Sequence, residues 1–291
     1  MHKSGFVNII GKPNVGKSTL MNALMGEKLS IITPKAQTTR HRIRGILNVE
    51  DYQIVYSDTP GIVSPQYKLH EAMMSFLNEA LDDADVILFV IEIKDQTPID
   101  ERTLFKLKQV TCPIFVLINK IDIGGQELLE KRVEEWKVIL PDAEVIPLSA
   151  LEKFNTDYVL RRLVDLLPES PPYFPKDEIT DKSQRFFVSE IIREKIFLLY
   201  HQEIPYSVEV VVEEFKDTEK IVRIRAIINV MRETQRGIII GKGGAALNKM
   251  GTQAREEIEL FLEKKVFLDL FVKVSKDWRD NAGRLKHFGY I

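Results

Sequence analysis

The first 168 residues alternate between two hydrophobic periods. Short runs rich in Val and Ile are typical of buried strands, and segments with apolar residues every three or four positions are typical of helices. The predicted strands are 6–10, 52–57, 86–91, 114–118 and 144–147, and the predicted helices are 68–81, 100–108 and 127–140. This order predicts an α/β domain over 1–168 with a doubly wound, mostly parallel sheet.

The pattern changes after this domain. Four prolines between Pro168 and Pro175 interrupt both periods, which predicts an extended, semi-rigid linker over 169–181. A smaller α+β domain is predicted over 182–291. Its expected elements are a helix whose apolar face runs from Val188 to Leu199, strands at 206–215 and 220–231, two helices around Gly241, and a last strand at 267–274.

Composition narrows the class of protein. The chain is 44% hydrophobic and 29% charged, has a single cysteine, Cys112, and has five scattered histidines. An internal disulfide is excluded, and no zinc site is expected. No apolar run reaches the roughly 18 residues of a membrane span, and the first residues lack a signal-peptide cleavage pattern. We therefore expect a cytoplasmic protein.

The net charge has opposite signs in the parts of the chain up to the end of the linker and after it. Residues 1–181 hold 21 Lys and Arg against 27 Asp and Glu, whereas residues 182–291 hold 20 against 16. The first part is acidic and the second basic, which predicts different partners for the two parts.

A glycine-rich loop, GKPNVGKS, follows the first predicted strand and opens a helix. In the pattern G-x-x-x-x-G-K-S, backbone N–H groups surround the β-phosphate, Lys17 reaches the β- and γ-phosphates, and the Ser18 hydroxyl binds Mg²⁺. A plain strand-to-helix turn is the alternative, but the position after a strand favours phosphate binding. The predicted nucleotide contacts here are Gly11, Lys12, Pro13, Asn14, Val15, Gly16, Lys17, Ser18 and Thr19.

Two later strand ends carry candidates for reading the base. In NKID, Asp122 can accept from the N1–H and N2–H₂ groups of guanine, which adenine lacks. The Lys120 stem can cover the ring, and Asn119 can tie this loop to the phosphate loop. Ser149 and Ala150 follow the last strand of the domain, and we expect the Ala150 N–H to point at the guanine O6. These residues therefore predict that the bound nucleotide carries guanine.

The end of the strand at 52–57 supplies a candidate γ-phosphate sensor, DTPG. Asp58 is expected to hold the Mg²⁺ water shell and the Gly61 N–H to bond the γ-phosphate, with Thr59 and Pro60 between them. Upstream, ITPKAQTTRHR is typical of a mobile loop. Thr39 is the preferred second hydroxyl ligand of Mg²⁺, and Thr38 is its rival.

Together these elements resemble the guanine-nucleotide-binding proteins over about residues 5–168. The resemblance implies GTP hydrolysis, with Lys17, Thr39 and Gly61 as catalytic residues. Ile62 stands where Ras-like enzymes have a water-orienting glutamine, so slow intrinsic hydrolysis is expected. Relatives with Pro-Asn in the loop use the asparagine to hold K⁺, so the resemblance implies a K⁺ site at Asn14, against the alternative that Asn14 only shapes the turn. Activity that falls when Na⁺ replaces K⁺ would be its signature.

The second domain contains IIIGKGG, a G-x-x-G turn between two predicted helices. Such a turn admits a nucleic-acid backbone and points a helix N-terminus at a phosphate, while residues 238–240 can carry unstacked bases. A plain helix–helix corner is the alternative. With its flanking helices and strands and the net positive charge of residues 182–291, the segment resembles a type II KH domain that binds single-stranded RNA. The candidate RNA contacts are Arg236, Ile239, Ile240, Gly241, Lys242, Gly243 and Gly244.

A GTPase with QTTRH in its mobile loop, the linker PPYFPKDEITD and a KH domain resembles the Era family over essentially the whole chain. This resemblance implies a ribosome-assembly factor that binds near the 3′ end of 16S ribosomal RNA in the 30S subunit, with peripheral inner-membrane contact in some relatives. GTP would favour RNA binding and hydrolysis release. Nothing in the sequence demands more than a monomer.

Two other function classes fit parts of the pattern. A GTP-dependent regulator could use the KH domain on another RNA, or act mainly on a protein, because a KH sequence does not reveal its target. An RNA-modifying enzyme has less support, since the sequence has no candidate catalytic cysteine, zinc cluster or second cofactor loop.

Overall fold

The computed structural model describes residues 1–291, which form two compact units. Unit 1 comprises residues 1–30, 39–64 and 73–181, and unit 2 comprises residues 31–38, 65–72 and 182–291. Each unit has its own β-sheet. No helix is both long enough and apolar enough to cross a membrane.

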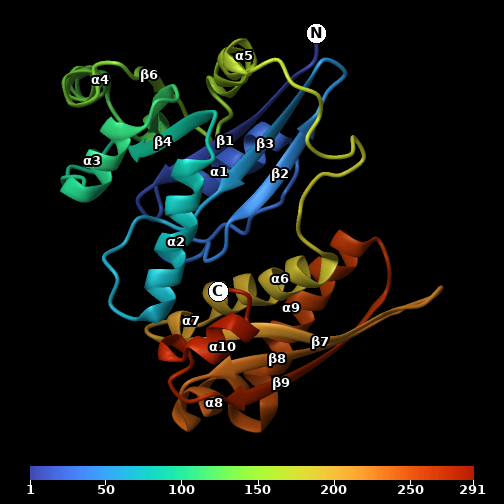
Figure 1. The fold of residues 1–291 in the computed structure, drawn as a ribbon. Helices are drawn as coiled ribbons and strands as arrows, with labels where there is room; N and C mark the ends of the chain where they lie inside the picture. The colour runs from blue at the N-terminus through green and yellow to red at the C-terminus, as the bar shows by residue number, and fades with distance from the viewer. The chain divides into compact units, whose positions relative to one another are not determined.

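Unit 1 is built on a six-stranded sheet with the order β2-β3-β1-β4-β5-β6 (Figure 1). The strands are β1 (Lys3–Gly11), β2 (Ile43–Asn48), β3 (Tyr52–Asp58), β4 (Val86–Glu92), β5 (Ile114–Asn119) and β6 (Glu144–Pro147). Only β2 runs antiparallel to its neighbour, and the other pairs are parallel. The predicted mostly parallel sheet is confirmed.

Helices cover both faces of this sheet. On one face, Leu77, Leu107 and Trp136 bury against β1, β4 and β5, and they come from α2 (Lys68–Asp82), α3 (Glu101–Gln109) and α4 (Gln126–Ile139). On the other face lie α1 (Lys17–Met25) and α5 (Thr156–Leu166), which contact each other. A 3₁₀ turn, η1 (Ile121–Ile123), follows β5.

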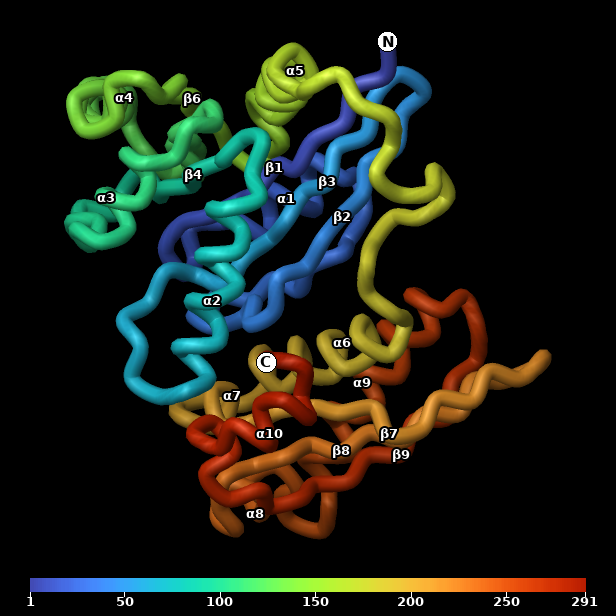
Figure 2. The backbone as a smooth tube through the Cα atoms, in the orientation of Figure 1, coloured from blue at the N-terminus to red at the C-terminus, as the bar shows by residue number.

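The proline-rich stretch 169–181 belongs to unit 1. Figure 2 shows it as a yellow segment after α5 that bends sharply, at the turns over 173–177. The Gln53 carboxamide oxygen accepts from the backbone N–H groups of Tyr173 (2.7 Å) and Phe174 (3.0 Å). The Tyr173 ring also stacks on Phe6 with 5.0 Å between the centroids. These contacts fasten the stretch to β1 and β3.

Unit 2 holds a three-stranded sheet of β7 (Glu209–Asp217), β8 (Val222–Val230) and β9 (Val266–Val274), with β8 in the middle. The alternation in VRIRAI places Val222, Ile224 and Ala226 in the core and Arg223 and Arg225 outside it. The helices packed on the buried side are α6 (Gln184–Leu199), α8 (Glu233–Ile240) and α9 (Ala245–Leu262). The remaining elements are α7 (Ile204–Ser207), η2 (Lys242–Gly244), η3 (Trp278–Asp280) and α10 (Ala282–His287).

Two short segments from the first half of the sequence cluster with unit 2, namely 31–38 and 65–72. The Arg193 guanidinium on α6 is 1% exposed, pairs with Glu190, and donates to the Thr38 carbonyl. The Lys35 ammonium donates to the carbonyls of Phe197 and Tyr200 at the end of α6. Residues 31–38 are therefore held by hydrogen bonds to α6.

Candidate functional site

The predicted nucleotide residues meet at one edge of the unit 1 sheet. Apart from Thr39, which precedes β2, they lie at the carboxyl ends of β1, β3, β5 and β6, in the loops that follow, or at the start of α1. These four strands are parallel, and their carboxyl ends share that edge. Loops at this edge form the ligand site of doubly wound sheets.

The phosphate loop needs glycine at two positions where it approaches other backbone or side chains. Gly11 has φ 151°, and a Cβ there would lie 2.3 Å from the Val90 carbonyl oxygen. Gly16 has φ 99°, and a Cβ there would lie 2.3 Å from the Asn119 side-chain nitrogen. Asn14, at φ 64°, also adopts the left-handed conformation. The loop therefore curls tightly just before α1 begins at Lys17.

Lys17 is buried, at 6% exposure, and its ammonium points back into the loop. It donates to the carbonyls of Gly11 (3.1 Å) and Lys12 (2.8 Å). Burial lowers the pKa of Lys17 to about 8, and the nearby carboxylate of Asp58 opposes that shift. The lysine is thus a buried cation with only carbonyl partners, a setting that strongly favours an anionic ligand.

Three oxygen-bearing side chains converge beside Lys17. Ser18 Oγ donates to Asp58 Oδ2 at 2.6 Å, Thr39 Oγ1 donates to the same oxygen at 3.3 Å, and the two hydroxyls lie 2.9 Å apart. The Thr38 hydroxyl instead donates to the Lys35 carbonyl at 2.7 Å. The geometry therefore favours Thr39 over Thr38 as the threonine of this cluster.

This cluster suits a hard divalent cation. Two hydroxyls and a carboxylate are the oxygen donors that Mg²⁺ prefers. Asp58 is fully buried, burial raises its pKa, and its Oδ1 has no hydrogen-bond partner in the protein. Buried carboxylate oxygens normally have a partner, so the orphaned Oδ1 fits a site that is completed by a cation and its water shell.

The loop after β5 is fixed to the phosphate loop by Asn119. Its carboxamide nitrogen donates to the Val15 carbonyl at 2.8 Å, as predicted. Lys120, in the left-handed conformation, pairs with Glu92 at 2.6 Å. Ser149 Oγ donates to Asp122 Oδ1 at 2.6 Å, which orients a carboxylate that is otherwise exposed. Asp122 therefore presents its remaining acceptor capacity outward, where a base can approach.

Two predicted nucleotide contacts have other partners. The Ala150 N–H donates to the Asn119 carboxamide oxygen at 2.9 Å, so its expected contact with the guanine O6 stays a prediction. The Thr59 hydroxyl is fully buried and donates to the Ile9 carbonyl at 2.8 Å, so its side chain joins β3 to β1. In the same segment, the Ile62 N–H donates to the Gly11 carbonyl at 3.1 Å. Gly61 lies so close to Pro13 that a Cβ would be 2.7 Å from its nitrogen.

The glycine turn of unit 2 has the geometry that the sequence predicted. Gly241 (φ 71°, ψ 176°), Gly243 (φ 60°) and Gly244 (φ 82°) all have positive φ, and α9 starts directly after them. Lys242 is exposed between them. Arg236, one turn earlier on α8, is exposed and lies 3.4 Å from Glu233. The turn thus presents backbone and two cations on its surface.

One predicted RNA contact is wrong. The Ile239 side chain is 0% exposed and belongs to the core of unit 2, and its carbonyl accepts from the Tyr200 hydroxyl at 2.8 Å. A buried side chain cannot stack on a base. Ile238, on the same helix, is 51% exposed and has the accessible apolar surface.

Two family profiles match the chain. One, described as a 50S ribosome-binding GTPase, matches residues 6–120, and the other, described as a KH domain, matches residues 203–279. A GTPase Era from Geotalea daltonii is 47% identical over 289 residues, which cover 99% of this chain and 97% of that protein. The chain belongs to the Era family of GTPases. A second Era, from Staphylococcus haemolyticus, is 44% identical over 292 residues and covers 100% of this chain and 98% of that protein.

Solved Era structures share the fold over the full length. One is Era in complex with MgGDPNP and nucleotides 1506–1542 of 16S ribosomal RNA, with a TM-score of 0.95, 41% identity, and coverage of 100% of this chain and 99% of that one. Another is a variant of Aquifex aeolicus Era bound to GDP and AlF4⁻, with a TM-score of 0.95, 42% identity and coverage of 99% of both chains. The fold, a P-loop GTPase domain followed by a KH domain, is thereby shown.

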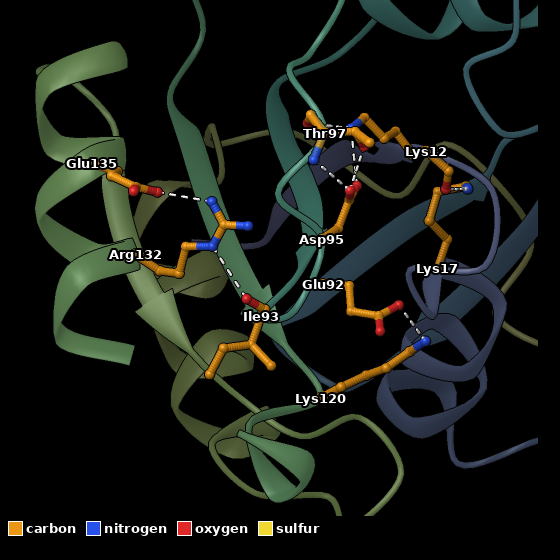
Figure 3. A network of polar contacts seen from close by, with 9 residues as sticks. All are labelled: Lys12, Lys17, Glu92, Ile93, Asp95, Thr97, Lys120, Arg132 and Glu135. Atoms are coloured by element: carbon orange, nitrogen blue, oxygen red, sulfur yellow. Dashed lines mark hydrogen bonds and ion pairs between the residues drawn. The ribbon is translucent and has the colours of Figure 1, made fainter. Parts of the chain in front are cut away.

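Some side chains around the Era-family nucleotide site were not predicted from the sequence. Glu92 holds Lys120, and Asp95 (2.9 Å) and Thr97 (2.6 Å) hold the Lys12 ammonium of the phosphate loop. These contacts are drawn in Figure 3. Glu92 directly follows the predicted strand 86–91, and a polar residue at the end of a strand was the available signal. Nothing in the sequence marked Asp95 or Thr97.

Proposed function

We propose that this Era-family GTPase is a GTP-timed RNA-binding switch. It binds the 3′ end of 16S ribosomal RNA through its KH domain and acts in assembly of the 30S subunit. The observation that carries this proposal is full-length similarity to an Era solved with both MgGDPNP and that RNA segment. The glycine turn of unit 2 supports RNA binding, and the phosphate loop of unit 1 supports GTP binding.

In this proposal, Lys17 binds the β- and γ-phosphates, and the N–H groups of the phosphate loop surround the β-phosphate. Ser18, Thr39 and Asp58 would hold Mg²⁺, which when bound offsets the negative charge of the phosphates. Asp122 reads guanine, and Asn119 ties the base loop to the phosphate loop. The Gly61 N–H bonds the γ-phosphate.

Hydrolysis is proposed to be slow without further help. The apolar side chain of Ile62 has no group that can orient a water, so the remaining stabilisation comes from Lys17 and the loop N–H groups. A K⁺ ion held by Asn14 would add positive charge near the transferring phosphate. This K⁺ site is proposed because relatives with Pro-Asn in the phosphate loop hold K⁺ there.

The KH domain is proposed to bind RNA through Gly241–Gly244, Lys242 and Arg236. Positive φ at the three glycines leaves the backbone open to a sugar-phosphate chain, and the start of α9 offers N–H groups to a phosphate. Ile238 replaces Ile239 as the apolar base contact because it is exposed.

Nucleotide and RNA are proposed to be coupled through residues 31–39. The chain passes from unit 2 to unit 1 between Thr38 and Thr39. Thr39 belongs to the Mg²⁺ cluster, and the Thr38 carbonyl accepts from Arg193. If GTP favours RNA binding, RNA must raise the affinity for GTP by the same factor.

We also propose that the chain is divided into a GTPase domain (1–168), a linker (169–181) and a KH domain (182–291). The protein is proposed to be a cytoplasmic monomer that makes peripheral contact with the inner membrane.

The test measures the affinity of a fluorescent single-stranded fragment matching the 3′ end of 16S ribosomal RNA. It compares a non-hydrolysable GTP analogue with GDP, in the natural chain and in Lys242→Glu. We expect tighter binding with the analogue, weakened about tenfold or more by Lys242→Glu, because a phosphate contact becomes a repulsion. Lys220→Glu is the matched control, since Lys220 is an exposed lysine in the β7–β8 turn, away from the glycine turn in sequence.

Equal weak binding with both nucleotides, or equal loss in Lys242→Glu and Lys220→Glu, would contradict the proposal. RNA crosslinked in cells and sequenced then separates the alternatives. Ribosomal 3′ ends support assembly, whereas another RNA, or none, supports a regulator with a different partner.

A further inference from the structure

A cavity of about 300 Å³ lies in unit 1 between the segment after β4 and helix α4. Its wall is largely apolar and includes Phe89, Leu128, Trp136 and Ile139. It is separate from the base loop, because none of the base-reading residues Asn119, Asp122 and Ser149 lines it. Its size is at the lower end of small-molecule pockets.

Arg132 supplies one buried charge to this wall. The residue is 9% exposed; its Nε donates to the Ile93 carbonyl at 3.1 Å and its Nη1 to Glu135 at 2.8 Å. Its Nη2 is buried and has no hydrogen-bond partner in the protein. In Figure 3 this nitrogen points away from both partners. An unpaired buried guanidinium N–H is costly, since buried polar groups are almost always satisfied.

The other charged groups at the cavity are already engaged or exposed. Lys12 and Asp95 pair at 2.9 Å, and Glu135 pairs with Arg132. Lys131, at the rim, is exposed. The net charge left at the cavity is therefore positive and comes from Lys131, and the buried donor left without a partner is the Nη2 of Arg132.

We propose that this cavity binds a small molecule with an apolar body and one carboxylate, with the carboxylate on Arg132 Nη2 and the apolar body against Trp136 and Ile139. A guanidinium is matched to a planar carboxylate, and a charge-assisted hydrogen bond is strongest where water is excluded. A bulky, doubly charged phosphate fits less well, because a single N–H group is available and the wall is apolar. The site is independent of the proposed RNA function.

The experiment uses 4-phenylbutyrate as the probe on the full chain loaded with GDP. Binding is measured by calorimetry and by the emission of Trp136, which lies on the wall, with Trp136→Phe to assign the fluorescence change. We expect saturation at about 1 mM or below. Arg132→Met, which keeps an unbranched stem and removes the charge, should weaken binding about tenfold or more. Lys137→Met, an exposed lysine on the same helix, should leave it unchanged.

Two comparisons keep the result decisive. The neutral analogue 4-phenyl-1-butanol should bind more weakly than the acid, and Leu128→Trp, which fills the cavity without touching the charge, should abolish binding even if Arg132→Met fails to fold. The proposal is overturned by an absence of saturable binding, by equal affinity for the acid and the alcohol, or by Leu128→Trp binding as well as the natural chain.

Discussion

The phosphate-side part of the nucleotide site in unit 1 is assembled from buried and half-buried side chains that already pair with one another, whereas the glycine turn of unit 2 presents backbone and two exposed cations. Asp58, Ser18 and Thr39 lie within hydrogen-bond distance before any ligand is considered. Lys242, by contrast, is exposed at the surface of its turn.

The difference follows from what each site has to recognise. A base is distinguished by the donors and acceptors on its edge, which requires oriented side chains that would be left unpaired by the wrong base. A sugar-phosphate backbone is uniform, so close approach and positive charge suffice. Substitutions at the first site should therefore change ligand identity, and those at the second should change affinity or conformation.

The sharpest test of side-chain recognition is Asp122→Asn. In the proposed function the Asp122 carboxylate accepts from two N–H groups of guanine, and an amide would present a donor to one of them. We expect GDP affinity to fall by about a thousandfold, or about 4 kcal/mol. Xanthosine diphosphate, whose ring has a carbonyl in place of the amino group, should bind better to the variant than to the natural chain. Competition against a fluorescent nucleotide measures both affinities.

Asp142→Asn is the matched control, because Asp142 is an exposed aspartate outside the site. It should leave both affinities unchanged. A variant at Asp122 that loses GDP and xanthosine diphosphate equally would mean that the carboxylate holds the loop through Ser149 rather than reading the base.

The buried cation of the nucleotide site gives the next largest effect, on stability. Burial lowers the Lys17 pKa from 10.5 to about 8, so the unfolded chain binds more protons than the folded chain between these values. Stability of the nucleotide-free protein therefore rises through this window, and the cost of the buried charge is fully present below pH 8. Relative to Lys17→Met, the natural chain should gain up to about 3 kcal/mol between pH 8 and 10.5.

Urea unfolding of both proteins across this pH range measures that gain. Lys108→Met, at an exposed position on α3, should show no such slope. Parallel curves for Lys17→Met and the natural chain would mean that Lys17 is not held as a buried cation without nucleotide.

Elements with a regular hydrophobic period and loops with a known motif could be predicted from the sequence. Features that depend on contacts between residues far apart in the chain could not. The strands β1 and β3 to β6 followed from periodicity, and the loop motifs followed from their spacing. The edge strand β2 was missed because Arg42, just before it, and Arg44, within it, break the apolar pattern. Arg42 is buried because Asp83, Ser57 and Asn8 all accept hydrogen bonds from its guanidinium.

Site details were lost for the same reason. The sequence did not show that the Ala150 N–H donates to Asn119, because this contact depends on how the fold brings the two loops together. In IIIG, the three isoleucines are identical in type, and only the rotation of α8 decides that Ile239 is buried while Ile238 is exposed.

The smallest predicted effects separate two glycines of the glycine turn in unit 2. Gly241 has φ 71° and ψ 176°, a region essentially restricted to glycine, and an added Cβ would lie 2.7 Å from the Ala246 Cβ. Gly243 has the milder left-handed φ of 60°, with nothing within 4 Å of a Cβ. Gly241→Ala should therefore lower the free energy of unfolding by about 2–3 kcal/mol, and Gly243→Ala by about 1 kcal/mol. Urea unfolding of the full chain, followed by the emission of Trp278 in the core of unit 2, measures both. Equal losses would mean that the turn relaxes around the new methyl group, and that its backbone conformation is less fixed than the side-chain geometry of the nucleotide site.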